Sequence, residues 1–255
     1  MVFWKKKDAA RQLESIPVGH YHQVMEQGHP VRRAWHLLKF TRVLEALPPG
    51  PGLSLLDIGC FAGSFLSLCP ESRFSRQLGV DILPEQIAYA NEHFGTPFRR
   101  FQHLRSLAEL EGLPDTYDCV TSIEVIEHLE ERDIQALIDG AADRLNPGGR
   151  LVLSTPNYAS TWPLLEVLLN RVSDVAYDEQ HITRFTYFDC DEKLRRIAPR
   201  LAGEFTLEFK TTTHLVAPFL AFAGVERSRQ LSTFVEHRTW KVPFGNLVLM
   251  SWQKR

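Results

Sequence analysis

Glu124, Glu127 and His128 lie close together in the segment Ser122-Ile-Glu-Val-Ile-Glu-His-Leu129 and are residue types that do chemistry. Their spacing is i, i+3 and i+4, so a helix over this stretch would place all three on one face. Two carboxylates and an imidazole suit a divalent cation of the Mg²⁺ or Mn²⁺ type. The alternative is that the acids favour a helix N-terminus through its dipole, while His128 is a general base or only packs.

A second histidine, His181, stands in the polar segment Asp178-Glu-Gln-His-Ile-Thr-Arg-Phe-Thr186. A helix is predicted directly after it, from Tyr187 to Ile197. His181 therefore lies in a loop, where it could approach the first three residues from another part of the chain.

A glycine-containing turn follows a short apolar run in Leu55-Leu-Asp-Ile-Gly-Cys-Phe-Ala-Gly-Ser-Phe65. Glycine lets the backbone approach a ligand closely, and the helix N-terminus after the turn favours an anionic group. The dinucleotide fingerprint G-x-G-x-x-G is absent, because Cys60, Phe61 and Ala62 separate the two glycines. Asp81 ends the next apolar run, where a carboxylate can accept hydrogen bonds from both hydroxyls of a ribose.

Apart from His181, these residues lie at or just after the ends of predicted strands. Short apolar runs predict strands over residues 53–58, 77–81, 98–102, 117–123 and 150–155, and helices are predicted over 64–68, 84–94 and 131–145. Such alternation requires a doubly wound α/β fold with a mostly parallel sheet and helices on both faces. Ligands bind beyond the carboxyl ends of such strands, so the chemistry is expected after Ile58, Asp81, Ile123 and Thr155.

The two ends of the chain are organised differently. Pro48-Pro-Gly-Pro-Gly52 separates a helical cap over residues 1–50, with a helix from Arg32 to Leu47, from a domain over 51–255. Strands predicted over 205–213 and 246–252 lack a helical crossover and are expected to form an antiparallel edge pair. The residues between them, about 214–245, are expected to be a lid insertion.

Composition excludes several classes of protein. The chain has 255 residues, 44% of them hydrophobic, and a net charge of −2, which excludes global disorder. No apolar run is long enough to span a membrane, and no signal peptide or C-x-x-C pair is visible, so a cytoplasmic protein is expected. Residues 108–145 carry eleven acidic and two basic side chains, which disfavours a nucleic-acid partner.

Three motifs together resemble class I S-adenosylmethionine-dependent methyltransferases: Leu56-Asp-Ile-Gly-Cys-Phe-Ala-Gly63, Gly79-Val-Asp81, and Asn146-Pro-Gly-Gly149 before a strand. The resemblance implies S-adenosylmethionine as cofactor, held at the strand ends by Asp57, Gly59, Cys60, Phe61, Gly63, Asp81, Ile82, Ser122 and Ile123. Phe61 departs from the family, which usually has glycine there. The acid that often follows the third strand in the family, for adenine, has no counterpart in His103-Leu-Arg-Ser-Leu.

The Glu-x-x-Glu-His block is similar to those of two methyltransferase families, the ubiquinone-biosynthesis O-methyltransferases and the small-RNA 3′-terminal 2′-O-methyltransferases. In the second family two Glu, the adjacent His and a later His bind a metal, so Glu124, Glu127, His128 and His181 are candidate metal ligands as well as candidate catalytic residues. His36 and Arg42 are six residues apart, a spacing similar to that of a His and an Arg ahead of the glycine motif in the ubiquinone O-methyltransferases. There the Arg meets the cofactor carboxylate; ordinary helix surface is the alternative here.

The predicted function is methyl transfer from S-adenosylmethionine, with or without Mg²⁺ or Mn²⁺, to a hydroxyl of a small or lipid-linked molecule. Peripheral membrane contact is compatible with such an acceptor. The alternatives are methylation of an RNA 3′ end, a nucleotide-dependent oxidoreductase on the same architecture, and a cofactor-binding module without turnover.

Overall fold

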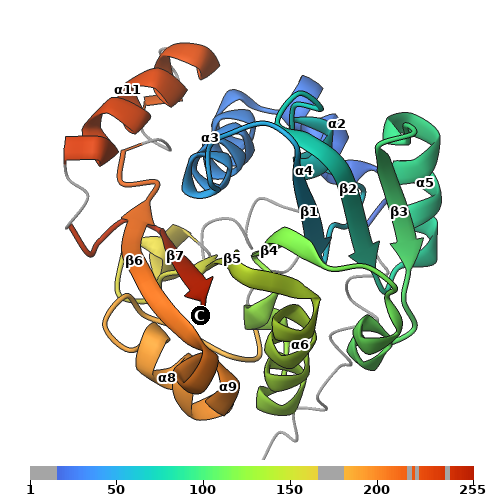
Figure 1. The fold of residues 1–255 in the computed structure, drawn as a ribbon. Coiled ribbons are helices and arrows are strands. Elements are labelled where there is room, and N and C mark those ends of the chain that lie inside the picture. Colours follow the sequence, from blue (N-terminus) through green and yellow to red (C-terminus); the bar gives the residue numbers. More distant parts are fainter. Residues whose placement is uncertain (1–15, 166–180, 217–219, 222–223, 239–241) are drawn as a thin grey trace, which may run out of the picture.

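The computed structural model describes residues 16–165, 181–216, 220–221, 224–238 and 242–255, and the chain folds around one seven-stranded sheet (Figure 1). The strands are β1 (Leu53–Ile58), β2 (Phe74–Asp81), β3 (Arg99–His103), β4 (Tyr117–Ile123), β5 (Leu145–Pro156), β6 (Phe205–Thr213) and β7 (Leu247–Lys254). Their order is β3-β2-β1-β4-β5-β7-β6, and only β7 runs antiparallel to its neighbours β5 and β6. The predicted doubly wound sheet with an antiparallel pair near the C-terminal end is confirmed.

Helices cover both faces of the sheet (Figure 1). One face carries α2 (His20–Gln27), α3 (Pro30–Ala46), α4 (Ser64–Ser67) and α5 (Pro84–Phe94), and the other carries α6 (Glu131–Arg144), α8 (Cys190–Ile197) and α9 (Pro199–Glu204). Each face has its own apolar core: Phe40, Phe65 and Ile87 belong to the first, Ile134 and Leu194 to the second. Helix α11 (Val225–Arg238), in the region expected to be a lid insertion, packs against α3.

Several element bounds differ from the predicted ones for local reasons. The helix predicted from Tyr187 begins at Cys190, because Thr186 donates from its backbone N–H and its hydroxyl to the Asp189 carboxylate and so closes a turn first. Strand β2 begins at Phe74 rather than Gln77. Helix α2 was missed, since its eight residues are mostly polar and too few for a clear apolar period.

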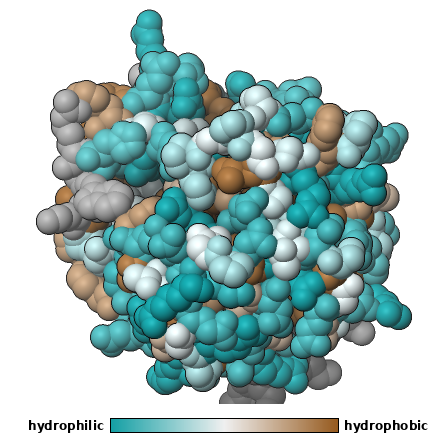
Figure 2. Space-filling view, viewed as in Figure 1, coloured by the Kyte–Doolittle hydropathy of each residue, from teal (hydrophilic) through white to brown (hydrophobic). Residues whose placement is uncertain are grey.

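The surface seen in Figure 2 is mostly hydrophilic, with scattered apolar residues. Within the described ranges, no helix combines the length and apolar character needed to cross a membrane.

Candidate active site

The glycine turn and Asp81 lie side by side at the carboxyl ends of β1 and β2. The N–H groups of Gly59 and Cys60 donate to the Val80 carbonyl at 2.8 and 3.1 Å, which folds the turn onto the end of β2. The Asp81 carboxylate accepts from the N–H of Phe61 at 2.8 Å and from that of Leu83 at 3.0 Å. Burial raises the pKa of Asp81, and these N–H donors oppose that rise.

The glycines of the turn are required by the packing of the protein itself. Gly59 and Gly63 have φ values of +80° and +78°, in the left-handed region that favours glycine. A Cβ on Gly59 would lie 2.4 Å from Cγ2 of Val125, and one on Gly63 would lie 2.7 Å from Cε1 of Phe101. The neighbouring side chains therefore already require glycine at both positions, without the close ligand that the sequence suggests as the reason.

Two further residues expected at the cofactor lie next to or within this turn. Asp57, one residue before the end of β1, accepts from the Thr121 hydroxyl at 2.7 Å and has its pKa raised by burial to about 7. Burial likewise raises the pKa of the Cys60 thiol well above its usual range, so Cys60 is not a thiolate nucleophile.

Two buried hydroxyls near the strand ends make no hydrogen bond. They belong to Ser64, directly after the glycine turn, and to Ser122, at the end of β4. Ser122 is followed by the half-buried Ile123, whereas Ile82, beyond β2, is exposed. Since buried hydroxyls are normally paired, these two orphans at the predicted ligand edge fit a bound polar molecule such as S-adenosylmethionine.

The predicted shared helix face of Glu124, Glu127 and His128 is wrong. Only residues 126–128 form a helical turn, the 3₁₀ turn η2 (Ile126–His128), and Glu124 stands before it with φ +54°. The backbone therefore turns between the two glutamates. Glu124 pairs with Lys39 of α3, whereas Glu127 lies with the two histidines.

Glu127, His128 and His181 form a compact group. Each offers one ligand atom, and the three atoms lie within 4.8 Å of one another. Backbone N–H groups of Ile182 and Thr183 donate to the Glu127 carbonyl at 2.8 and 3.0 Å and thereby fix the His181 segment on η2. The predicted approach of His181 from a distant loop is thus present, but Glu124 is not part of the group.

The side chains of this group have specific partners. Thr155 of β5 donates its hydroxyl to Oε2 of Glu127 at 3.1 Å, while Oε1 is buried without a partner. Burial raises the pKa of Glu127 to about 8, although the positive charge that His181 carries when protonated would oppose the rise. The hydroxyl of Tyr158 lies 2.7 Å from Nδ1 of His181, a contact that orients the imidazole ring.

Sequence reasoning missed an aromatic wall beside this group. Trp162 lies 6.1 Å from His181 and 5.4 Å from Trp35, measured between ring centroids, and Trp35 lies 4.3 Å from His214. The concentration of aromatic residues around Trp35 was the only signal, since Trp162 and His214 are far from it in the chain.

Arg42, expected near a cofactor carboxylate, is occupied by protein partners. Its guanidinium lies 2.5 Å from Oε2 of Glu45, 2.8 Å from Nε2 of His237 and 3.3 Å from Oε2 of Glu236. Glu236 and His237 belong to α11, so in this structure Arg42 fastens α11 to α3.

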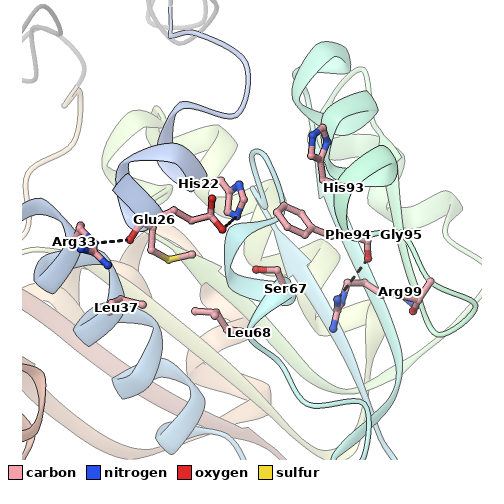
Figure 3. Close-up of a pocket in the computed structure, with 12 residues that line it drawn as sticks. His22, Glu26, Arg33, Leu37, Ser67, Leu68, His93, Phe94, Gly95 and Arg99 are labelled. Atoms are coloured by element: carbon pink, nitrogen blue, oxygen red, sulfur yellow. Dashed lines mark hydrogen bonds and ion pairs between the residues drawn. The ribbon is translucent and has the colours of Figure 1, made fainter. Parts of the chain in front are cut away.

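A separate pocket of about 520 Å³ lies between α2, α3, α4 and α5 (Figure 3). Its lining includes His22, Glu26, Leu37, Ser67, Phe94 and Arg99, and none of the residues proposed from the sequence. Arg99, its deeply buried charge, donates to Gln77 and to the carbonyls of Cys69 and Phe94. This pocket therefore shows no unpaired buried charge and lies away from the strand ends that carry the polar group.

The fold and the site indicate a methyltransferase, and comparison with known proteins agrees with this class. Residues 31–197 match the family profile described as a methyltransferase domain. The chain belongs to this family of S-adenosylmethionine-dependent methyltransferases.

Relatives named ubiquinone biosynthesis O-methyltransferase match part of the chain. The protein of Nitrobacter winogradskyi is 35% identical over 121 residues, 47% of this chain and 44% of the relative. That of Aliivibrio fischeri is 31% identical over 122 residues, 47% of this chain and 51% of the relative. The chain thus spans about half the length of the curated relatives it matches.

Solved structures share the fold over nearly the whole chain. The N-methyltransferase NodS of Bradyrhizobium japonicum with S-adenosyl-L-homocysteine has a TM-score of 0.61 at 16% identity, covering 97% of this chain and 99% of its own. A geranyl diphosphate methyltransferase with sinefungin has a TM-score of 0.63 at 15% identity, covering 97% of both chains.

Proposed function

We propose that this protein transfers the methyl group of S-adenosylmethionine to a hydroxyl of a small or lipid-linked molecule. The observation that carries the proposal is the group formed by Glu127, His128 and His181. It lies just beyond β4, beside the strand ends that carry the glycine turn and Asp81. The name of the curated relatives, which specifies O-methylation, supports oxygen as the acceptor atom.

The proposed division of work follows from the positions of the residues. Asp81 and the turn hold the nucleoside end of the cofactor. When bound, S-adenosylmethionine supplies a methyl group on a positively charged sulfur, already activated for transfer. The protein then has to align the acceptor oxygen with that methyl group and remove the hydroxyl proton.

His181 is the proposed proton acceptor. Tyr158 lies 2.7 Å from its Nδ1 and orients the imidazole ring, and the group with Glu127 and His128 places that ring beyond β4. A neutral Glu127 can donate a hydrogen bond from its carboxyl group, and Thr155 fixes the orientation of that group. The alternative use of the same side chains is to hold Mg²⁺ or Mn²⁺, which would bind the acceptor oxygen and make its proton easier to remove.

Lipid-linked acceptors are favoured by the rim around the site. Leu164, Ile182, Phe188 and Phe244 are large apolar side chains exposed to solvent. They belong to three segments that Asn157 joins: its side chain donates to the carbonyls of residues 243 and 245 and accepts from the N–H of residue 187. An apolar tail attached to the acceptor can lie along these side chains and cover them.

The test is transfer of labelled methyl from S-adenosylmethionine to a panel of hydroxyl-bearing acceptors, with amines of the same skeletons as controls. We expect methyl ethers as products, and turnover lost in His181→Ala and Glu127→Ala with cofactor affinity nearly unchanged. Loss of activity in EDTA and its return with Mg²⁺ or Mn²⁺ would assign the metal; full activity in EDTA would leave His181 as a metal-free base. Methylation of the amines alone would overturn the choice of oxygen.

A further inference from the structure

Lys39 is a buried cation aimed at the end of β4. Three lysine or arginine side chains are buried in the described part of the chain, and they differ in their partners: Lys39, Arg42 and Arg99. The Arg42 guanidinium faces the acids of α3 and α11, and Arg99 donates to groups at the other edge of the sheet. Only Lys39 among the three reaches a residue that follows a central strand, Glu124.

Glu124 is held in an unusual backbone conformation at that position. Its φ of +54° lies in the left-handed region, which costs a residue with a Cβ about 1–2 kcal/mol. Its N–H donates to the Ser154 carbonyl at 3.0 Å, which ties the turn to β5. A strained backbone of this kind persists where surrounding contacts hold it in place, and such residues are common at functional sites. Here the strained conformation separates the side chain of Glu124 from that of Glu127.

The two side chains form an oppositely charged pair. Burial alone would raise the pKa of Glu124, but the charge of Lys39 and its hydrogen bond hold that pKa below the ordinary value. Glu124 is therefore an anion at neutral pH. Asp57 of the neighbouring β1 pairs with Thr121 of β4, three residues before Glu124, so the pair lies among the residues proposed for the cofactor.

We propose that Lys39 and Glu124 bind the amino-acid end of S-adenosylmethionine, Lys39 taking its carboxylate and Glu124 its ammonium group. That end of the cofactor is a zwitterion, and a buried cation–anion pair offers it both opposite charges. The ammonium group of Lys39 has three donors, so it can serve Glu124 and a second carboxylate together. This inference rests on the proposed function, because it takes S-adenosylmethionine as the ligand, and it replaces Arg42 by Lys39 as the carboxylate partner.

The experiment compares two ligands by isothermal titration calorimetry. S-adenosyl-L-homocysteine has the amino-acid end, and 5′-deoxy-5′-methylthioadenosine has the same nucleoside and thioether without it. Lys39→Met should weaken the first ligand about ten- to a hundredfold and the second by less than about threefold. Lys210→Met is the matched control: Lys210 pairs with Asp191 between β6 and α8, and its loss should change neither affinity.

A lone Glu124 anion could unfold the Lys39→Met protein, so the double variant Lys39→Met/Glu124→Gln is measured beside it. This variant leaves no unpaired buried charge and should show the same selective loss. An equal loss for both ligands, or an unchanged affinity for S-adenosyl-L-homocysteine, overturns the inference while leaving the proposed function intact. If the wild-type protein binds neither ligand, the proposed function itself fails and the inference falls with it.

Discussion

Glu124 and Glu127 are three residues apart, yet their carboxyl groups prefer opposite protonation states. Lys39 holds the pKa of Glu124 below its ordinary value against the effect of burial, whereas burial raises the pKa of Glu127 to about 8. The left-handed backbone at Glu124 separates the two side chains. Two neighbouring acids whose pKa values are shifted in opposite directions are typical of sites where one group carries a charge and the other donates or accepts a proton.

The first prediction concerns stability against pH. The pKa of Glu127 rises from 4.5 to about 8 on folding, so between these values the folded protein holds a proton that the unfolded chain releases. Stability from this group is therefore greatest at low pH and falls as pH rises toward 8, by at most about 1.4 kcal/mol per pH unit. In Glu127→Gln, the free energy of unfolding measured with urea should therefore fall less steeply with pH between pH 5 and 8 than in the wild type.

Glu85→Gln, an exposed acid at the start of α5, is the control for that measurement and should leave the slope unchanged. If Glu127→Gln has the wild-type slope, the Glu127 carboxyl is ionised in the folded protein across this range.

The second prediction concerns the nucleoside end of the cofactor. The N–H groups of Phe61 and Leu83 bind different oxygens of Asp81, so Asp81→Asn keeps an acceptor for one of them and removes the charge that would accept the ribose hydroxyls. Affinity for S-adenosyl-L-homocysteine should fall about ten- to a hundredfold by calorimetry. Asp115→Asn, an exposed acid ahead of β4, should bind as the wild type does. Unchanged affinity in a folded Asp81→Asn protein would mean that the ribose does not bind at Asp81.

Much of the fold could be predicted because its signals are local. Pro84 and Gly95 delimit α5, and the apolar run from Tyr117 to Ile123 matches β4 in full. The glycine turn and Asp81 were expected together because parallel strands end at one edge. Such features need only neighbouring residues and a general rule of topology.

The site was less predictable because its contacts join distant residues. Lys39 and Glu124 are 85 positions apart, and nothing near either residue indicates the other. The helical spacing of Glu124, Glu127 and His128 suggested a shared face, but β4 is followed by Glu124 in a left-handed conformation and then by a 3₁₀ turn. Arg42 had a family-like spacing, and its acidic partner Glu236 comes from a helix that the sequence placed only within a lid.

The third prediction tests the apolar rim with acceptors that do or do not carry a prenyl tail. Phe244→Ser and Phe188→Ser should raise KM for the tailed acceptor about tenfold, since each buries its ring against the tail, and leave kcat and the tailless acceptor unchanged. Phe98→Ser, equally exposed but ahead of β3 at the opposite edge of the sheet, is the matched control. The same KM change for both acceptors would contradict a tail on this rim.

The fourth prediction separates strain from crowding in the glycine turn. Gly59 and Gly52 both have φ of +80°, but a Cβ on Gly52 meets nothing within 4 Å, whereas one on Gly59 meets Val125 at 2.4 Å. Gly52→Ala should cost about 1–2 kcal/mol of unfolding free energy, the backbone penalty alone. Gly59→Ala should cost clearly more, and Val125→Ala in the same chain should recover part of the excess. Equal losses at both positions would show that Val125 moves aside freely.

The last prediction concerns Phe61, the residue that replaces the usual family glycine. Its φ is +49°, its N–H binds Asp81, and its ring lies 5.0 Å from that of Tyr21 on α2. Phe61→Gly and Phe61→Ala both lose the ring, so any difference between them reports the backbone alone. The Phe61→Gly protein should be more stable than Phe61→Ala by about 1–2 kcal/mol in urea unfolding, because only Ala retains the left-handed penalty.

Both variants should be less stable than the wild type if contact with Tyr21 holds α2 on the turn, and Tyr21→Ala should then add little to the loss in Phe61→Ala. Additive losses in the double variant would mean that α2 is held by other contacts.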